Sequence, residues 1–305
     1  MVSDFREERL NAVRKFNPAI NTTTNPDDII LSSEVDAVVI ATPVFTHFAL
    51  AKKALENGKH VLLEKPMSST AAEAEELMTL ATQKGLLLMV DHTFLYTGAV
   101  RKMKDLIDDA SIGALQYFDS SRINLGLFQP DVNVLWDLAP HDISILLHVI
   151  PFKPVSVNAT GISHTKNGIE NMAYLTVNYN EDFIAHFNCS WSSPVKLRSL
   201  LIGGDKKMML FNDLEPTEKI RIYDTGYDYK SDEERKRILV DYRTGDVFIP
   251  KIEMKEALLG MADDFIQSIE NKSQPVSTAQ LGLEVVKILE ASQVSIKNKG
   301  QEVKL

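Results

Sequence analysis

The stretch His60-Val61-Leu62-Leu63-Glu64-Lys65-Pro66 decides the fold of this chain. Its apolar run is typical of a strand buried in a parallel sheet, and the proline that follows cannot continue the hydrogen-bond ladder. We therefore expect Glu64 and Lys65 at the carboxyl end of a central strand, the edge where open α/β sheets bind ligands. A solvated surface pair at an ordinary strand end fits the same residues, so the neighbouring sequence has to decide.

Short apolar runs alternate with helical segments on both sides of this stretch. The pattern predicts further strands at Val35–Ile40 and Leu86–Val90, and helices at Thr46–Asn57 and from Ser69 or Thr70 to Lys84. A glycine directly follows each helix, as expected for a helix end. Strands and helices that alternate at this spacing form βαβ units, so the predicted fold class is α/β with a parallel, doubly wound sheet.

The start of the chain departs from a complete dinucleotide-binding fold. Val2-Ser3 resembles the end of a strand, Asp4 follows it, and a helix is predicted from Phe5 to Phe16. Asp4 fits the acidic position that binds the adenosine ribose, or it caps the helix that follows. The pyrophosphate-binding motif G-x-G-x-x-G occurs nowhere in the sequence. We therefore expect an incomplete Rossmann-type parallel sheet, truncated at its N-terminus.

Two domains are predicted, residues 1–95 and residues 96–305. The second is expected to be an α+β domain with an open, mainly antiparallel sheet, and the C-terminal helix is expected to pack back on the first domain. Its predicted helices are Gly98–Asp109, Trp136–Ile150, Lys255–Ile269 and Leu281–Lys297. Its predicted strands are Leu115–Arg122, Ala173–Val177, Phe183–Phe187, Ser199–Ile202 and Lys207–Phe211. Gly203-Gly204 is interpreted as a turn and Asp224–Glu234 as an exposed loop.

Composition limits the function classes. The net charge of −9 and the pI near 5.3 argue against a nucleic-acid partner, and they leave no polybasic patch for a membrane surface. The sequence has no apolar stretch of transmembrane length, and its single cysteine, Cys189, is consistent with the reducing cytoplasm, the predicted location. His148, His164 and His186 lack the spacing of metal ligands, so no metal site is predicted.

Four motifs follow one another in a fixed order. They are Ala41-Thr42-Pro43 with His47, then Glu64-Lys65-Pro66, then Val90-Asp91-His92, then Asp137 and His141 within Trp136-Asp137-Leu138-Ala139-Pro140-His141-Asp142. With these motifs the chain resembles, from Asp4 to its C-terminus, the Gfo/Idh/MocA oxidoreductases, the family of glucose–fructose oxidoreductase and inositol dehydrogenase. The resemblance implies an enzyme that uses a nicotinamide cofactor to oxidise a secondary alcohol of a sugar, cyclitol or nucleotide sugar. It also implies homodimers or homotetramers formed through the outer face of the second domain's sheet.

The resemblance also implies roles for the matched residues. Lys65 and His141 are expected to flank the reacting hydroxyl as acid/base residues, because hydride transfer needs a base within hydrogen-bond reach of that oxygen. Asp137, four residues before His141, is expected to orient the imidazole or bind a substrate hydroxyl, although a contact that only stabilises the helix fits the same spacing. The expected cofactor-binding residues are Asp4, Ala41, Thr42, Pro43, His47, Glu64, Lys65 and His92. His47 equally fits a helix start without a ligand.

The chain departs from the family pattern at two places. Asp91 occupies a position where many relatives carry glycine, and the glycine-rich turn is absent, which is expected to weaken cofactor binding. The absence of the glycine-rich turn has three alternative explanations: the chain is truncated, it is a catalytically silent relative, or a partner replaces the lost piece. If Asp4 binds the ribose, NAD is the expected cofactor rather than NADP. The runner-up function is a sugar-binding or regulatory relative that holds no dinucleotide.

Overall fold

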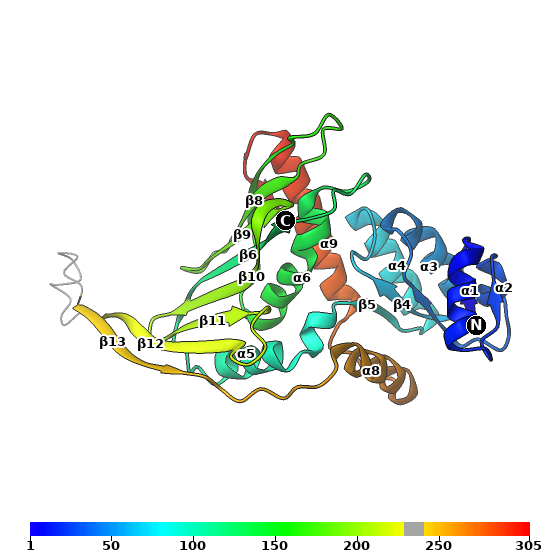
Figure 1. Ribbon diagram of the computed structural model, residues 1–305, viewed down its shortest axis with the longest axis horizontal. Coiled ribbons are helices and arrows are strands. Elements are labelled where there is room, and N and C mark those ends of the chain that lie inside the picture. The colour runs from blue at the N-terminus through cyan, green and yellow to red at the C-terminus, as the bar shows by residue number, and fades with distance from the viewer. Residues whose placement is uncertain (229–240) are drawn as a thin grey trace. The chain divides into compact units, whose positions relative to one another are not determined.

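The computed structural model describes residues 1–228 and 241–305, and these residues form two compact units (Figure 1). The first unit contains Met1–Asp91 and Met261–Val286, and the second contains His92–Gly260 and Lys287–Leu305. The chain therefore leaves the first unit directly after Asp91. It returns to that unit with a segment near its C-terminus.

The strands of the first unit form two separate parallel sheets. β1 (Val2–Ser3) pairs with β2 (Thr22–Thr23) in one sheet. The other sheet has β3 (Ala37–Ile40), β4 (His60–Glu64) and β5 (Leu88–Asp91) in that order. Val61, Leu62 and Leu63 of the middle strand β4 are at most 5% exposed, as its apolar run predicts. The predicted α/β fold with an incomplete parallel sheet is confirmed.

Helices cover the sheet β3-β4-β5. The helices of this unit are α1 (Glu7–Phe16), α2 (Asp27–Ile30), α3 (His47–Glu56) and α4 (Ala71–Lys84), and α8 (Ala257–Asn271) enters it from the second unit. The Thr70 side chain accepts the Glu73 backbone N–H and so caps α4, and Gly85 ends the helix with a φ of 64°. Helices α3 and α4 pack against each other and against the strands, which encloses the core of the unit.

A segment near the C-terminus is bonded to β5. The Ser277 hydroxyl donates to the Val90 carbonyl oxygen at 2.6 Å. Helix α9 (Ala279–Lys297) follows, and at Gly282 an added Cβ would lie 2.6 Å from Val90 Cγ2. Only glycine permits this close approach. The start of α9 therefore belongs to the packing of the first unit.

The second unit is built on a large open sheet. Its strands are β6 (Leu115–Leu125), β7 (Ser156–Ile162), β8 (Met172–Asn178), β9 (Ile184–Ser190), β10 (Ser192–Gly204), β11 (Met208–Asn212), β12 (Ile220–Asp228), β13 (Asp241–Phe248) and β14 (Val303–Lys304). Their order is β13-β12-β11-β10-β6-β9-β8-β7-β14. The pair β6–β9 is parallel and the other neighbours are antiparallel, which confirms the mainly antiparallel sheet.

Helix α6 (Val134–Val149) is the central helix of this unit. It packs against β6, β8 and β9 and against α5 (Gly98–Asp108), and the short 3₁₀ helix η2 (Thr93–Tyr96) also contacts it (Figure 1). The Asn133 side chain accepts the backbone N–H groups of Leu135 and Trp136. This cap starts the helix at Val134, earlier than the predicted Trp136.

Two interpretations of the sequence are wrong. Residues 224–228, expected in a loop, are part of β12. These residues show no apolar alternation, and their backbone pairing with β13 keeps them in the sheet. Residues 229–234 of the expected loop lie outside the described residues. Gly203-Gly204, expected as a turn, ends β10. A Cβ on Gly203 would lie 2.0 Å from Tyr117 Cε1, so the glycine makes room for an aromatic ring on the neighbouring strand. The sequence analysis also did not predict strands β2, β7, β13 and β14, or the first part of β12, residues 220–223.

Candidate active site

One group of candidate site residues lies in the first unit, at the carboxyl ends of β4 and β5. Glu64 is the last residue of β4, and the Lys65 backbone N–H donates to Glu64 Oε2 at 3.1 Å. The peptide bond from Lys65 to Pro66 is cis. Asp91 ends β5 and is the register partner of Glu64. Two carboxyl groups and a lysine therefore meet at the edge where parallel sheets bind ligands.

The half-buried Glu64 carboxyl holds its proton more tightly than an exposed glutamate does. Burial raises the pKa of Glu64, and the neighbouring Asp91 charge and a hydrogen bond between the two carboxyl groups raise it further. The Lys65 backbone N–H and the Lys65 charge lower the pKa of Glu64, but they are weaker than burial and the Asp91 charge. Burial is the main cause of the raised pKa, and the second carboxyl group adds to it because two neighbouring carboxyl groups disfavour the second ionisation.

Replacing Glu64 by glutamine is expected to flatten the pH dependence of stability. The pKa of Glu64 is higher in the folded chain, so its contribution to the free energy of unfolding is complete below the unfolded pKa near 4.5 and is lost as pH rises through the folded pKa. Glutamine cannot titrate, so denaturant unfolding from acidic to alkaline pH should lose that component. Glu56→Gln, at the exposed end of α3, is the control. An unchanged pH profile in Glu64→Gln would contradict this explanation.

The buried His47 side chain contacts the backbone that follows two strands, β3 and β4. The residue is 1% exposed, its Nδ1 lies 3.0 Å from the Pro66 carbonyl oxygen, and its Nε2 lies 2.7 Å from that of Thr42. Burial lowers the pKa of His47, and the backbone hydrogen bonds oppose this more weakly. A neutral imidazole has one N–H and donates to one of the two carbonyls. The ring therefore contacts the backbone next to Lys65, at Pro66, and the backbone of Thr42. Thr42 belongs to Ala41-Thr42-Pro43, which is exposed after the end of β3.

Asp4 lies at the carboxyl end of β1. Its Oδ1 accepts the Arg6 backbone N–H at 2.8 Å, and its Oδ2 accepts Arg9 Nη1 at 3.2 Å. The N-cap of α1 is Arg6, so Asp4 precedes the cap position that the alternative interpretation gave it. The carboxylate is therefore held at a strand end by contacts with Arg6 and Arg9.

A second group of candidate site residues lies in the second unit, on α6 and its neighbours. Asp137 and His141 are one helical turn apart, as the spacing predicts. Trp191, 1% exposed, donates its Nε1–H to Asp137 Oδ2 at 2.9 Å. The His141 ring packs edge-to-face against Phe94, with 5.2 Å between the ring centroids. His92, a predicted cofactor ligand, is 1% exposed and is the first residue of this unit.

A buried ion pair supports this part of α6. Arg122 Nη2 and Nε donate to the two Asp142 oxygens at 2.6 and 3.0 Å, and the Ser120 hydroxyl donates to Asp142 Oδ2 at 2.7 Å. The side chains of Arg122 and Asp142 are 5% and 3% exposed. Sequence reasoning missed the roles of Trp191, Phe94 and Arg122. The one available signal was Arg122 at an inward-facing position of a predicted strand, since a buried charge requires a partner.

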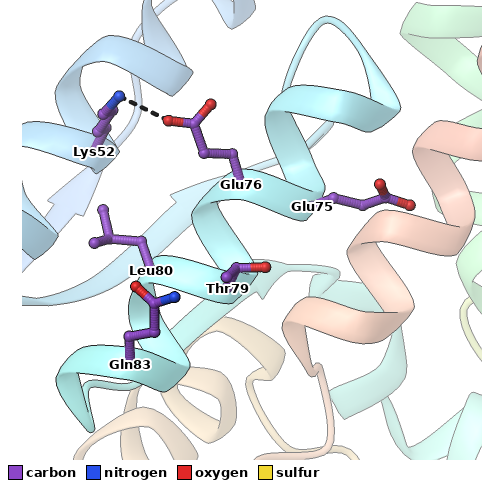
Figure 2. A pocket seen from close by; sticks show the side chains of 6 residues that line it. All are labelled: Lys52, Glu75, Glu76, Thr79, Leu80 and Gln83. Atoms are coloured by element: carbon purple, nitrogen blue, oxygen red, sulfur yellow. Dashed lines mark hydrogen bonds and ion pairs between the residues drawn. The ribbon is translucent and has the colours of Figure 1, made fainter.

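Within the first unit the structure brings together Thr42, His47, Glu64, Lys65 and Asp91. Within the second unit it groups a different set, namely Phe94, Arg122, Asp137, His141, Asp142 and Trp191. An open hollow of about 380 Å³ lies elsewhere, on α3 and α4, where Lys52 Nζ donates to Glu76 Oε1 at 2.7 Å (Figure 2). It contains no predicted site residue.

Two family models match this chain. Residues 1–92 match the model described as an oxidoreductase family with an NAD-binding Rossmann fold, and residues 100–210 match the Gfo/Idh/MocA C-terminal domain. The chain belongs to the Gfo/Idh/MocA oxidoreductase family. The Rossmann match covers the strand ends with Asp4, Thr42 and Lys65, and the C-terminal match covers Asp137 and His141.

The similar Gfo/Idh/MocA proteins include sugar and cyclitol dehydrogenases. The UDP-N-acetylglucosamine 3-dehydrogenase of Acidithiobacillus ferrooxidans is 34% identical over 48% of this chain and 47% of its own length. The scyllo-inositol 2-dehydrogenase (NADP(+)) of Bacillus subtilis is 26% identical over 67% of this chain and 55% of its own length. These alignments span about half the length of the curated relatives.

The solved structures extend the likeness to nearly the whole chain. A structure of the Acidithiobacillus ferrooxidans dehydrogenase superposes with a TM-score of 0.79 at 25% identity, covering 97% of this chain and 89% of that one. The aldose-aldose oxidoreductase of Caulobacter crescentus has a TM-score of 0.82 at 17% identity, over 99% and 90% of the two chains, and shows a shared fold. Among the described residues no helix is long and apolar enough to cross a membrane.

Proposed function

We propose that this Gfo/Idh/MocA chain is an NAD-dependent dehydrogenase that oxidises a secondary alcohol of a sugar, cyclitol or nucleotide sugar. The observation that carries the proposal is the placement of Glu64 and Lys65 at the carboxyl end of β4, in a chain whose α6 carries Asp137 and His141. The names of its relatives, which include a UDP-N-acetylglucosamine 3-dehydrogenase and a scyllo-inositol 2-dehydrogenase, support this substrate class.

The residues at the strand ends fit a dinucleotide in part. Ala41-Thr42-Pro43 is exposed at the end of β3, and the Asp4 carboxylate lies at the end of β1; parallel sheets bind ligands at such strand ends. The sequence holds no G-x-G-x-x-G turn for the pyrophosphate. When bound, the nicotinamide supplies the acceptor for the hydride that leaves the carbinol carbon. The chain's own residues have to hold the substrate and remove the hydroxyl proton.

Lys65 and His141 are the residues that remove the proton of the reacting hydroxyl. We assign His141 as the main acid/base residue because an imidazole titrates near neutral pH, and Lys65 as its partner on the reacting hydroxyl. Asp137 is fixed by the Trp191 indole N–H and so can orient the imidazole or accept a substrate hydroxyl. Glu64 accepts the Lys65 backbone N–H and so positions the lysine at the end of β4.

The reaction is tested by following the reduction of NAD by the purified chain. The substrate panel should contain UDP-N-acetylglucosamine, scyllo-inositol and free aldoses, the classes named by the relatives. The proposal expects turnover with at least one class. No reduction with any of them, in a chain that binds NADH, would contradict the proposed substrate class.

A catalytically silent, sugar-binding or regulatory relative is the alternative function. The observation that favours it is the absence of G-x-G-x-x-G from the sequence, because the glycine-rich turn and the following helix N-terminus normally stabilise the pyrophosphate charge. Such a protein would bind a sugar and no NADH. Calorimetric titration with both ligands therefore separates the two functions.

NAD is expected to bind more tightly than NADP. The Asp4 carboxylate repels a 2′-phosphate, and it also engages Arg6 and Arg9, which could otherwise receive that phosphate. Asp4→Asn should therefore raise NADP affinity by roughly tenfold, the value of one hydrogen bond to a charged group. Fluorescence titration with both reduced cofactors measures this, with Asp109→Asn as the control. Tighter NADP binding by the unmodified chain would contradict the role of Asp4.

The outer face of the second unit's sheet is the proposed site of homodimer or homotetramer formation. Tyr174 on β8, Ile184 on β9 and Leu201 on β10 are 43%, 49% and 39% exposed on this face. Leu201→Glu places a charge there and is expected to shift the sedimenting species to the monomer, because an unpaired charge is costly in an interface. Leu259→Glu, exposed on α8, is the control. A monomeric unmodified chain would contradict the proposal.

A further inference from the structure

Phe94 lies between an ion pair and the proposed acid/base histidine. Its ring centroid is 5.2 Å from that of His141, at an interplanar angle of 62°. The guanidinium carbon of Arg122 lies 4.9 Å from the same ring centroid. Phe94 belongs to η2, directly packed against α6, so it contacts the helix that carries His141. One aromatic ring therefore connects a buried cation with the histidine.

Arg122 is itself held in a fixed position. Two hydrogen bonds to Asp142 fix its planar guanidinium, and the Ser120 hydroxyl satisfies Asp142 from the same strand, β6. Both charged side chains are at most 5% exposed, so little water competes for them. A desolvated cation attracts an aromatic ring more strongly than an exposed one. The ion pair therefore fixes the position of Phe94.

We infer that Phe94, held by Arg122, is a positioning residue that sets the orientation of the His141 imidazole toward the reacting hydroxyl; this inference rests on the proposed function. An acid/base group has to lie within hydrogen-bond reach of the proton that it transfers. A histidine ring turns about two side-chain torsions, and an edge-to-face aromatic contact restricts both of them. Phe94 thus acts on the reaction through His141.

The charged groups around this cluster come from two elements. Asp137 and Asp142 lie on α6 with His141, and Arg122 lies on β6. Asp142 is neutralised by Arg122, and Asp137 accepts the Trp191 indole N–H. Replacing Phe94 leaves these charges unchanged, so an effect of the substitution reports on the ring itself.

The experiment combines Phe94→Leu with nuclear magnetic resonance of the histidine side chains. The His141 signal is assigned from its loss in His141→Gln. Phe94→Leu is expected to shift the His141 ring signals and to lower kcat by roughly tenfold to a hundredfold with KM little changed. Phe94→Tyr keeps the ring and is expected to restore kcat and the signals.

Phe152→Leu is the matched control. Phe152 packs edge-to-face on Phe183 at 5.3 Å and 63°, is also half-buried, and lies in the same unit. It should leave kcat and the His141 signals unchanged. Wild-type kcat or unshifted His141 signals in Phe94→Leu would overturn the positioning role, as would equal losses in Phe152→Leu. A wild-type chain that transfers no hydride contradicts the proposed function, and the His141 signals still report whether the ring contact exists.

Discussion

Replacing Lys65 by methionine is expected to lower kcat for alcohol oxidation by about 10²–10⁴-fold, the usual contribution of a positioned acid/base group. The methionine side chain has a similar length but has no group that can accept or donate a proton. Cofactor binding should change less than kcat, because strand β4 and the hydrogen bond from the Lys65 backbone N–H to Glu64 do not depend on the ammonium group. Steady-state kinetics with a substrate from the active class measures both effects.

Lys52→Met is the control for this substitution. Lys52 lies in the same unit, on α3, where its side chain is 38% exposed and pairs with Glu76. Its replacement should leave kcat unchanged, since exposed ion pairs contribute little. His141→Gln should match the loss in Lys65→Met. A Lys65→Met variant with wild-type kcat would contradict the assignment of Lys65 as an acid/base residue.

Replacing Asp142 by asparagine is expected to lower the free energy of unfolding by about 3–5 kcal/mol, because it leaves the buried Arg122 charge without its partner. The two side chains are 5% and 3% exposed, so water cannot replace the lost carboxylate charge. Denaturant unfolding monitored by tryptophan fluorescence measures this. Trp191 reports on the correct unit, since it is buried beside α6.

Two comparisons identify the cause of this loss. The double variant Arg122→Met and Asp142→Leu removes both charges and should recover most of the lost stability. Glu76→Gln breaks the exposed pair with Lys52 and should cost less than about 1 kcal/mol. An Asp142→Asn variant within about 1 kcal/mol of the wild type would contradict the importance of the buried pair.

Local patterns predict the parts of the fold that depend on local physics. The apolar run before Glu64 predicts β4 because a strand buried on both faces needs such a run, and Thr70 and Gly85 predict the ends of α4 because a cap and a left-handed residue are local requirements. Strand β12 was not predicted. Backbone pairing with β13 stabilises its second part, and such pairing leaves no apolar alternation in the sequence.

The same distinction holds for the candidate site. The motifs predict which strand ends and which helix carry Lys65, Asp137 and His141. They cannot predict that His47 contacts the carbonyls of Thr42 and Pro66, or that Trp191 donates to Asp137. These contacts depend on how distant elements pack, and a spacing along the sequence does not contain that information.

Binding of NADH by this chain tests the central claim most directly. Titration followed by nicotinamide fluorescence is expected to show saturable, stoichiometric binding that Lys65→Met retains. Ala41, Thr42, Pro43 and Asp4 lie exposed or half-buried at the strand ends, where such a ligand binds. The absence of saturable NADH binding, in a chain shown to be folded by its cooperative unfolding, would contradict the dehydrogenase and favour the sugar-binding relative.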